Sequence, residues 1–315
     1  MRYLVFFIWY RLPKIFLIPL LPLSLIYFII IFVRKYFLTY ILSRYSSPIN
    51  LIIVGNLNIG GSGKTPFTLW LANHLYTKEK KIGIISSGYN SNVTIPMQIN
   101  SESKANEVGD EALLLHSKTK AVVVSSDNRV NSTKFLEDKN LDYIIHDDGL
   151  QHYQLNRNYE FIITKYSSND KLLLPCGPLR EPKFFHPSAT FVYSNYHGDM
   201  YPGFYTKLSQ IRSPYDSQVY LPNDIRFSKS YLLTAIADDT NLKEELKGYH
   251  ADIICSSFMD HHQFIPSDIP DTAEPILVTE KDFTKLKEFK VKNIYILEQC
   301  LVPNDKLTKI IENFR

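Results

Sequence analysis

A glycine-rich segment that ends in lysine and threonine is the strongest chemical signal in this sequence. It reads Asn-Ile-Gly-Gly-Ser-Gly-Lys-Thr at residues 58–65, between an apolar run and a helical pattern. In a phosphate-binding loop, backbone N–H groups at a helix N-terminus hold the phosphates, the lysine reaches the β and γ phosphates, and the threonine hydroxyl binds Mg²⁺. The predicted nucleotide-binding residues are Asn58, Ile59, Gly60, Gly61, Ser62, Gly63, Lys64 and Thr65.

The loop departs from the usual pattern at one position. The pattern G-x-x-x-x-G-K-[ST] has glycine where this chain has Asn58. Asparagine tolerates a positive φ better than most residues, so we expect the loop to survive the change. The next segment places Phe67, Trp70, Leu71 and Leu75 on one helical face. This context favours a phosphate loop over a glycine-rich turn with an incidental lysine.

Two adjacent carboxylates supply the second part of the expected site. Asp147 and Asp148 follow the apolar residues 143–145. In a parallel sheet the carboxyl end of such a strand lies beside the phosphate loop, where carboxylates hold Mg²⁺ directly or through water. We predict a Mg²⁺ site formed by Asp147, Asp148 and Thr65, rather than a pair of solvated turn carboxylates.

The elements that must position these residues follow a strand–helix alternation from residue 50 onward. This alternation predicts an α/β fold, a P-loop NTPase-like parallel sheet covered by helices, with a smaller C-terminal α/β domain. Strands are expected at residues 51–54, 82–85, 121–124, 143–145, 161–164, 191–193, 231–236, 276–279 and 293–297. Residues 241–246 and 304–313 are expected to be helical, and a polar stretch at 213–230 interrupts the alternation. We therefore expect an N-terminal membrane-anchoring helical segment at 1–46, a phosphate-loop core at 47–228 and the smaller domain at 229–315.

The N-terminal segment has the composition of a membrane anchor. Residues 15–33 contain no charged side chain, and as a helix they would extend about 28 Å. Two basic residues flank each end, so charge does not orient the segment. Pro19 and Pro22 leave two geometries open, a crossing helix and a kinked helix within one leaflet. We expect a permanent anchor rather than a signal peptide or a core helix.

Charge and cysteine content exclude several classes of protein. Residues 1–47 hold six Lys or Arg and no Asp or Glu, which leaves 29 basic and 32 acidic residues in the rest of the 315-residue chain. A mildly acidic body argues against a general nucleic-acid binder. The three cysteines lie far apart, without a C-x-x-C spacing, so neither a disulfide framework nor a zinc knuckle is expected.

Nucleotide binding alone leaves a transferase, an ATPase switch and a motor open. A partitioning-type switch would have lysine where this loop has Ile59, which lowers that alternative. A kinase needs a base for the acceptor hydroxyl and cations for the transferring charge. The Asp-His-His triplet at 260–262 also suggests a two-metal phosphoesterase, but the further aspartate motifs of such a centre are not evident. Candidates for the kinase roles are Asp110, Arg129, Arg180, Glu181 and His261.

Several motifs, in order along nearly the whole chain, resemble the tetraacyldisaccharide 4'-kinase family of lipid A synthesis. They follow the apolar N-terminal segment and include Gly-Gly-Ser-Gly-Lys-Thr-Pro at 60–66, Gly-Asp-Glu at 109–111, Asp-Asp-Gly-Leu-Gln-His-Tyr at 147–153, Gly-Pro-Leu-Arg-Glu at 177–181, Asp-His at 260–261 and Thr-Glu-Lys-Asp at 279–282. That family's loop also opens without the usual glycine. One departure is Ser87, which stands where the family has arginine.

The resemblance implies transfer of the γ-phosphoryl group of ATP to the 4'-hydroxyl of an acylated glucosamine disaccharide 1-phosphate. The reaction would take place at the bacterial inner membrane, with the catalytic domain facing the cytoplasm. The alternative is a membrane-tethered ATPase switch without a lipid acceptor, and the oligomeric state stays open. By resemblance, Lys64 and Thr65 bind the phosphates and Mg²⁺, and Asp147 and Asp148 bind the metal with Glu181 nearby. Asp110 is the base paired with His261, although the adjacent His262 is chemically equivalent to His261. Arg129 and Arg180 lie near the reacting phosphates.

Overall fold

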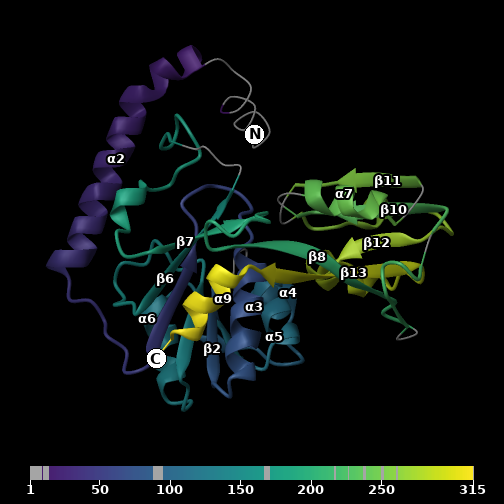
Figure 1. Cartoon of the computed structure of the whole chain (residues 1–315), viewed down its shortest axis with the longest axis horizontal. Coiled ribbons are helices and arrows are strands. Elements are labelled where there is room, and N and C mark those ends of the chain that lie inside the picture. The colour runs from purple at the N-terminus through teal and green to yellow at the C-terminus, as the bar shows by residue number, and fades with distance from the viewer. Residues whose placement is uncertain are drawn as a thin grey trace.

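A single sheet runs through both halves of the molecule (Figure 1). The strands of its first half are β1 (Asn50–Gly55), β2 (Ile82–Ser86), β3 (Met97–Gln98), β4 (Val122–Ser125), β5 (Tyr143–Asp147), β6 (Tyr159–Lys165) and β7 (Thr190–Ser194). The second half contains β8 (Gly203–Arg212), β9 (Val219–Tyr220), β10 (Lys229–Thr234), β11 (Asp252–Ser257), β12 (Ile276–Thr279) and β13 (Ile294–Pro303). The computed structural model describes residue 9 and residues 14–87, 95–166, 171–215, 218–225, 227–236, 239–249, 252–259 and 262–314.

The first half, which we call the core lobe (residues 50–202), has the predicted parallel sheet. Strands β7, β6, β1, β5, β2 and β4 lie side by side in that order and all run parallel, with β3 added antiparallel at the edge. Residue Val54 of β1 is in register with Asp147 of β5. The end of the strand that leads into the phosphate loop therefore lies beside the two predicted metal ligands.

Helices cover this sheet because their apolar faces pack on buried strand residues. Phe67, Leu71 and Leu75 of α3 are buried as predicted, in one cluster with Ile52 and Val54. Truncating a ring like that of Phe67 to alanine typically costs about 3–5 kcal/mol of stability.

The helices that follow the N-terminal segment belong to both lobes. They are α3 (Lys64–Thr77), α4 (Ala105–Val108), α5 (Asp110–Lys118), α6 (Arg129–Glu137), α7 (Thr240–Lys247), α8 (Glu280–Leu286) and α9 (Asp305–Glu312), with short 3₁₀ turns η3 (Lys183–Phe185), η4 (Pro266–Asp268) and η5 (Lys287–Phe289).

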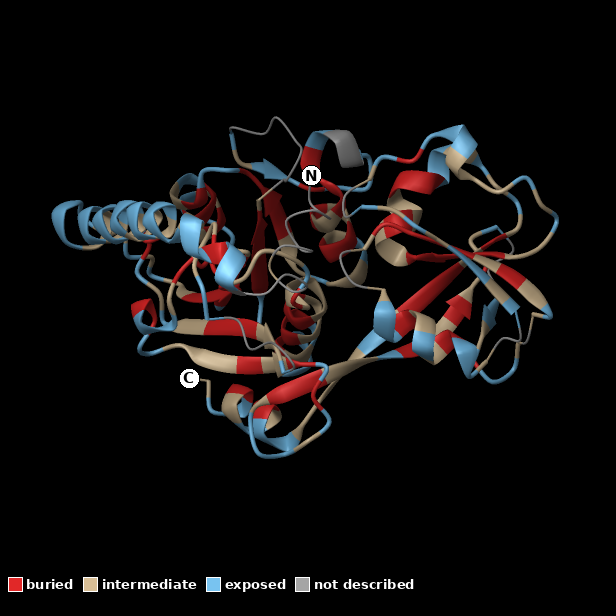
Figure 2. Cartoon of the chain, turned by 90° about the horizontal axis from the view of Figure 1, so that it is seen from above, coloured by how far each residue is buried: buried red, intermediate tan, exposed pale blue. Residues whose placement is uncertain are grey.

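The C-terminal lobe (residues 229–293) has its own apolar clusters on β10, β11 and β12, which pair in parallel. Buried strands are visible in both lobes in Figure 2. The lobes are joined by the long antiparallel pair β8 and β13, with a register shift at Glu298 and Gln299. The sequence did not predict β3, β8, β9 or β11, and it ended β13 too early. The predicted division at residue 228 stays a prediction.

The last helix returns to the core lobe. Leu307 and Ile311 of α9 are buried in the same cluster as Phe67, and Phe314 stacks on Tyr159 with ring centroids 4.0 Å apart. The predicted helix at 304–313 is therefore present. It completes the core of the phosphate-loop lobe rather than that of the C-terminal lobe.

The apolar N-terminal segment is helical from end to end. It consists of the 3₁₀ helix η1 (Lys14–Leu20), the α-helix α2 (Leu21–Tyr36) and the short wider helix η2 (Phe37–Ile41). Pro19 lies inside η1 and Pro22 in the first turn of α2, which explains the change of helix type. Among the described residues, Ile15–Ile41 is the stretch long and apolar enough to cross a membrane. It lies along the outside of the core lobe, mostly exposed (Figure 2).

Candidate active site at the phosphate loop

The phosphate loop turns tightly between β1 and α3. Gly60 and Gly63 have φ of 117° and 89°, a conformation that side chains disfavour. Helix α3 begins at Lys64 and has no side-chain cap, so its first N–H groups are left for a ligand at the end of the helix where the macrodipole favours anions. The Lys64 ammonium donates to Oδ1 of Asn56 at 3.1 Å, and the Asn56 amide donates to the Gly60 carbonyl. The loop is built as a phosphate cradle.

Asn58 is accommodated for a different reason from the one expected. It has no positive φ, so that explanation was wrong. Asn58 instead forms an antiparallel bridge with Leu179, while Ile59 N–H donates to the Pro178 carbonyl at 2.9 Å. The opening of the loop is thus extended backbone, in which asparagine needs no special conformational freedom.

The two aspartates meet this loop at the end of β5. Lys64 Nζ lies 3.4 Å from Oδ1 of Asp148, and the Thr68 hydroxyl of α3 donates to Oδ1 of Asp147 at 2.9 Å. Asp148 has a φ of 51°, in the left-handed region that Asp adopts more readily than most residues. The predicted Lys64, the first turns of α3 and the two predicted aspartates therefore lie together.

The environments of the two carboxyl groups push their pKa values apart. Burial raises the pKa of Asp147 to about 7, with help from the negative charges of Glu111 and Asp148. Burial also acts on Asp148, but Lys64, Arg180 and Arg129 outweigh it and hold the pKa of Asp148 below its ordinary value. Burial thus dominates at Asp147 in spite of the nearby Lys64, whereas the neighbouring cations dominate at Asp148.

These residues fit a Mg²⁺ ion that is shared with phosphates. Within the described ranges no group of three or more His, Cys, Asp or Glu side chains could hold a metal alone. Mg²⁺ usually takes one or two carboxylates and completes its shell with phosphate oxygens and water. Ser62 Oγ is buried without a hydrogen bond, as expected of a site completed by a ligand. Asp147, Asp148 and Thr65 are the residues that could hold it.

The two predicted arginines lie on different sides of the aspartates. Arg180 borders the cleft, and its Nη1 is 3.7 Å from Oδ2 of Asp148. Arg129 is buried beneath them and donates to the main-chain carbonyls of Ile85 and Asp147 at 2.8 and 2.7 Å. Its charge therefore acts on the aspartates from below, while its terminal nitrogens hold the ends of β2 and β5.

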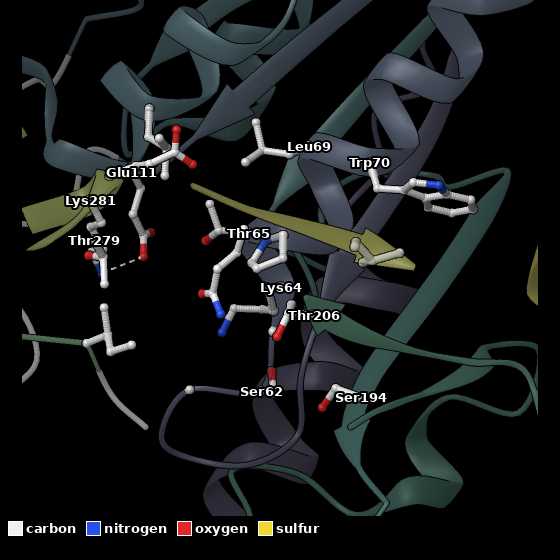
Figure 3. Close-up of a pocket in the computed structure, with 18 of the residues that line it drawn as sticks. Ser62, Lys64, Thr65, Leu69, Trp70, Glu111, Ser194, Thr206, Thr279 and Lys281 are labelled. Atoms are coloured by element: carbon white, nitrogen blue, oxygen red, sulfur yellow. Dashed lines mark hydrogen bonds and ion pairs between the residues drawn. The ribbon is translucent and has the colours of Figure 1, made fainter. Parts of the chain in front are cut away.

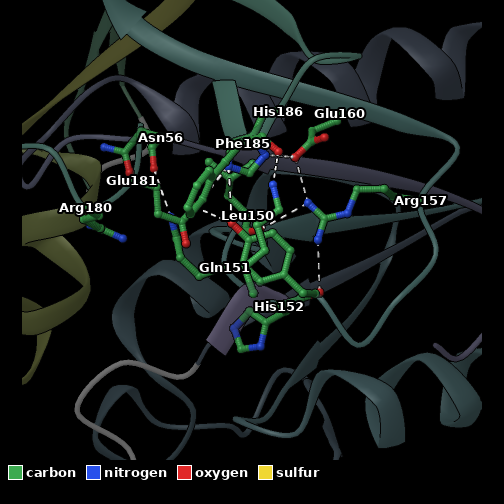
Figure 4. A network of polar contacts seen from close by, with 12 residues as sticks. Asn56, Leu150, Gln151, His152, Arg157, Glu160, Arg180, Glu181, Phe185 and His186 are labelled. Atoms are coloured by element: carbon green, nitrogen blue, oxygen red, sulfur yellow. Dashed lines mark hydrogen bonds and ion pairs between the residues drawn. The ribbon is translucent and has the colours of Figure 1, made fainter. Parts of the chain in front are cut away.

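Glu181 belongs to a buried polar network (Figure 4). Its Oε2 accepts from the Tyr153 hydroxyl at 2.7 Å and lies 3.0 Å from His186 Nε2. The other ring nitrogen of His186 lies 2.7 Å from Glu160, which also pairs with Arg157. Burial would lower the pKa of His186, but the two glutamates outweigh it and raise that pKa. The predicted metal ligand Glu181 thus has one oxygen engaged in this network.

The predicted base Asp110 is held by the C-terminal lobe. It begins α5, is buried, and its Oδ2 lies 3.1 Å from Nζ of Lys285 on α8. A second ion pair joins Glu111 to Lys281 at 3.1 Å between the same helices (Figure 3). Lys281 and Lys285 were not predicted, because no local pattern links residues so far apart in sequence.

The Thr-Glu-Lys-Asp motif makes the start of α8. Thr279 caps the helix by accepting from Asp282 N–H, and the Asp282 carboxylate accepts from the Thr279 and Thr234 hydroxyls. The predicted partner of Asp110, His261, lies outside the described residues. Its neighbour His262 stacks on Phe258 and pairs with Asp268 at 2.8 Å.

A cleft of about 870 Å³ opens beside the phosphate loop, but Asp110, Asp147 and Glu181 are not among its lining residues. It is lined by the loop from Ile59 to Pro66, by Asp148 and Arg180, and by parts of β8, β13 and α8 (Figure 3). Ser87 also borders it, at the position where the resembling family has arginine. The volume is ample for a nucleotide. Lining residues that the sequence did not indicate include Lys165, Ser194 and Thr206.

Comparison with known proteins shows the family of the chain. The family model described as LpxK, tetraacyldisaccharide-1-P 4'-kinase, matches residues 16–314. The chain belongs to this kinase family. The tetraacyldisaccharide 4'-kinase of Psychromonas ingrahamii is 35% identical over 302 residues, 92% of each chain. That of Pseudoalteromonas translucida is 31% identical over 307 residues, 95% of this chain and 93% of the relative.

A solved structure supports the same assignment. The crystal structure of LpxK from Aquifex aeolicus in complex with ATP matches with a TM-score of 0.76 and 26% identity, covering 94% of this chain and 98% of that one. The fold class predicted from the sequence is therefore confirmed. Membership of the family favours the kinase over the ATPase switch.

Proposed function

We propose that this kinase transfers the γ-phosphoryl group of ATP to the 4'-hydroxyl of tetraacyldisaccharide 1-phosphate. The observation that supports this proposal best is the approach of Lys64 to Asp148 at 3.4 Å, where the phosphate loop meets the strand end inside the cleft. Family membership supplies the acceptor class.

The phosphates of ATP bind at the start of α3. Loop N–H groups and the helix N-terminus hold the phosphate oxygens, and Lys64 exchanges part of its contact with Asp148 for the β and γ phosphates. Asp147, Asp148 and Thr65 would hold Mg²⁺, which would supply positive charge for the phosphate oxygens. Arg180, at the edge of the cleft, offers a second cation for the charge of the transferring group.

Asp110 acts as the base for the acceptor hydroxyl, with His261 as its partner. The carboxylate accepts the hydroxyl proton as the oxygen attacks phosphorus. Lys285 compensates the negative charge of this buried group. Arg129 acts as a positioning residue, because its guanidinium ties the end of β5 to the end of β2.

The cleft faces the cytoplasm, where ATP is available, and the apolar helix lies within one leaflet of the inner membrane. Contacts with the core lobe extend from Leu17 to Lys35, a length of about 27 Å at 1.5 Å per residue. A perpendicular crossing would carry the adjoining non-helical backbone of residues 172–186, with the charged and exposed Lys183, into hydrocarbon. The mildly acidic body leaves no role for a nucleic-acid partner.

The proposal is tested by incubating the purified full chain with radiolabelled ATP and the disaccharide 1-phosphate lipid in mixed micelles. We expect a labelled bisphosphorylated lipid, a loss of at least about 100-fold for Lys64→Ala, and a similar loss of turnover for Asp110→Asn with MgATP affinity nearly intact. Lys78→Ala, on the exposed end of α3, is the control. ATP hydrolysis without any labelled lipid would instead favour the ATPase switch.

A further inference from the structure

The membrane helix is bound to a segment that we call the docking segment (residues 172–186). Positions 24, 27, 28, 31 and 35 of α2 are half-buried and form one helical stripe. The Ser24 hydroxyl donates to the Leu173 carbonyl at 3.2 Å, and the Tyr27 hydroxyl donates to the Arg180 carbonyl at 2.8 Å. Near the end of α2 the Lys35 ammonium donates to the Phe185 carbonyl. The helix therefore holds this segment along most of its length.

The same segment holds the phosphate loop on its other side. Arg180 N–H donates to the Leu57 carbonyl at 2.6 Å, next to the bridge between Asn58 and Leu179. The peptide groups on both sides of Arg180 are thus fixed, one by the loop and one by Tyr27. The guanidinium of Arg180 reaches Asp148 from this fixed backbone.

The residue after Arg180 is fixed as well. Glu181 is buried in the network with Tyr153 and His186 (Figure 4), which holds its side chain, whereas the carbonyl between Arg180 and Glu181 accepts its bond from Tyr27. The Tyr27 hydroxyl is the contact of α2 that lies closest in sequence to the Arg180 side chain. Its loss would free the Arg180 carbonyl while leaving the rest of the helix docked.

We infer that Tyr27 is a positioning residue for Arg180, and that the membrane helix is in this way a structural part of the nucleotide site as well as an anchor. The inference rests on the proposed placement of ATP at the phosphate loop. It does not depend on which acceptor receives the phosphoryl group. It deepens the proposed function by assigning a role in nucleotide binding to a residue of the membrane segment.

The test is a double-mutant cycle between Tyr27→Phe and Arg180→Ala in the full chain. MgATP dissociation constants are measured with a fluorescent ATP analogue, on vesicles of phosphatidylethanolamine and phosphatidylglycerol that contain no acceptor lipid. We expect Tyr27→Phe to weaken MgATP binding by about threefold to tenfold, the usual range for one lost hydrogen bond. In the Arg180→Ala background the same change should have no further effect.

Tyr36→Phe is the matched control, because it removes a hydroxyl from the exposed face of the same helix. We expect it to bind MgATP like the wild type, and all variants to sediment equally with vesicles. Additive effects in the cycle, or a loss of MgATP affinity that only parallels a loss of vesicle binding, would overturn the inference. The cycle measures MgATP binding and no phosphoryl transfer. Its outcome therefore does not depend on whether the proposed transfer reaction takes place.

Discussion

The Nζ atom of Lys285 on α8 lies 3.1 Å from the Oδ2 atom of Asp110 on α5, and both side chains are buried. This ion pair joins the C-terminal lobe to the residue proposed as the base. Removing one partner of such a buried pair leaves an uncompensated charge and typically costs about 3–5 kcal/mol. The ion pair therefore links the position of the C-terminal lobe to the charge balance of the Asp110 carboxylate.

Lys285→Met should lower both stability and turnover. We expect the free energy of unfolding in urea to fall by about 3 kcal/mol and kcat to fall at least about tenfold, with MgATP affinity changed little. Lys285→Arg should recover part of kcat because it keeps the charge. Lys281→Met, which breaks the more exposed pair with Glu111, should cost only about 0–1 kcal/mol. Equal effects of the two methionine variants would contradict the special role of Lys285.

The binding of Mg²⁺ with nucleotide should depend on the ionisation of Asp147. The pKa of this group is raised to about 7, and Mg²⁺ binds the carboxylate, so apparent affinity should rise by up to about tenfold per pH unit below pH 7 and level off above it. Isothermal titration at several pH values measures this, together with proton release near pH 7. Asp147→Asn should bind weakly with a flat pH profile.

The stability of the ligand-free protein should show the opposite trend. Since the folded pKa of Asp147 lies above the unfolded value of about 4, the stabilisation is fully present below pH 4 and is lost as the pH rises through 7. The difference between the melting temperatures of Asp147→Asn and the wild type should therefore grow between about pH 4 and 7 in favour of the variant and level off above pH 7. A melting-temperature difference that does not change with pH would show that burial does not raise the pKa of Asp147.

The variant Glu181→Gln tests whether Glu181 is a metal ligand or only a member of the buried polar network. Because Oε2 of Glu181 already contacts Tyr153 and His186, we expect a loss of about 1–3 kcal/mol in unfolding free energy and little change in the Mg²⁺ concentration at half-maximal activity. Glu160→Gln, in the same network, serves as the control. A tenfold rise in the required Mg²⁺ for Glu181→Gln alone would place this residue on the metal.

Arg129→Lys should lower both the stability of the protein and its affinity for MgATP. Lysine keeps the charge but cannot reach both the Ile85 and the Asp147 carbonyls as the guanidinium does. We expect about 2 kcal/mol less stability in a urea titration and weaker MgATP binding, because one buried carbonyl loses its donor. A variant with full affinity and normal stability would contradict the positioning role.

The phosphate loop and the positions of most core strands along the chain could be predicted because they depend on local sequence. A glycine-rich turn, Lys64 and the apolar face of α3 leave few alternatives. Strand β11 was missed because it is an edge strand with little buried surface, and β8 because its burial does not follow a regular alternation. The place of Arg129 beneath the aspartates was missed because only the tertiary fold brings the ends of β2 and β5 under one side chain.

The return of α9 to the core lobe constrains how the protein is made. Leu307 and Ile311 complete the cluster that supports the helix behind Lys64. The apolar helix leaves the ribosome hundreds of residues earlier and can reach the bilayer at once. The core of the catalytic lobe cannot be completed until residues 305–312 have emerged. With the proposed membrane anchor, we therefore expect the nascent chain to reach the bilayer well before it becomes an enzyme.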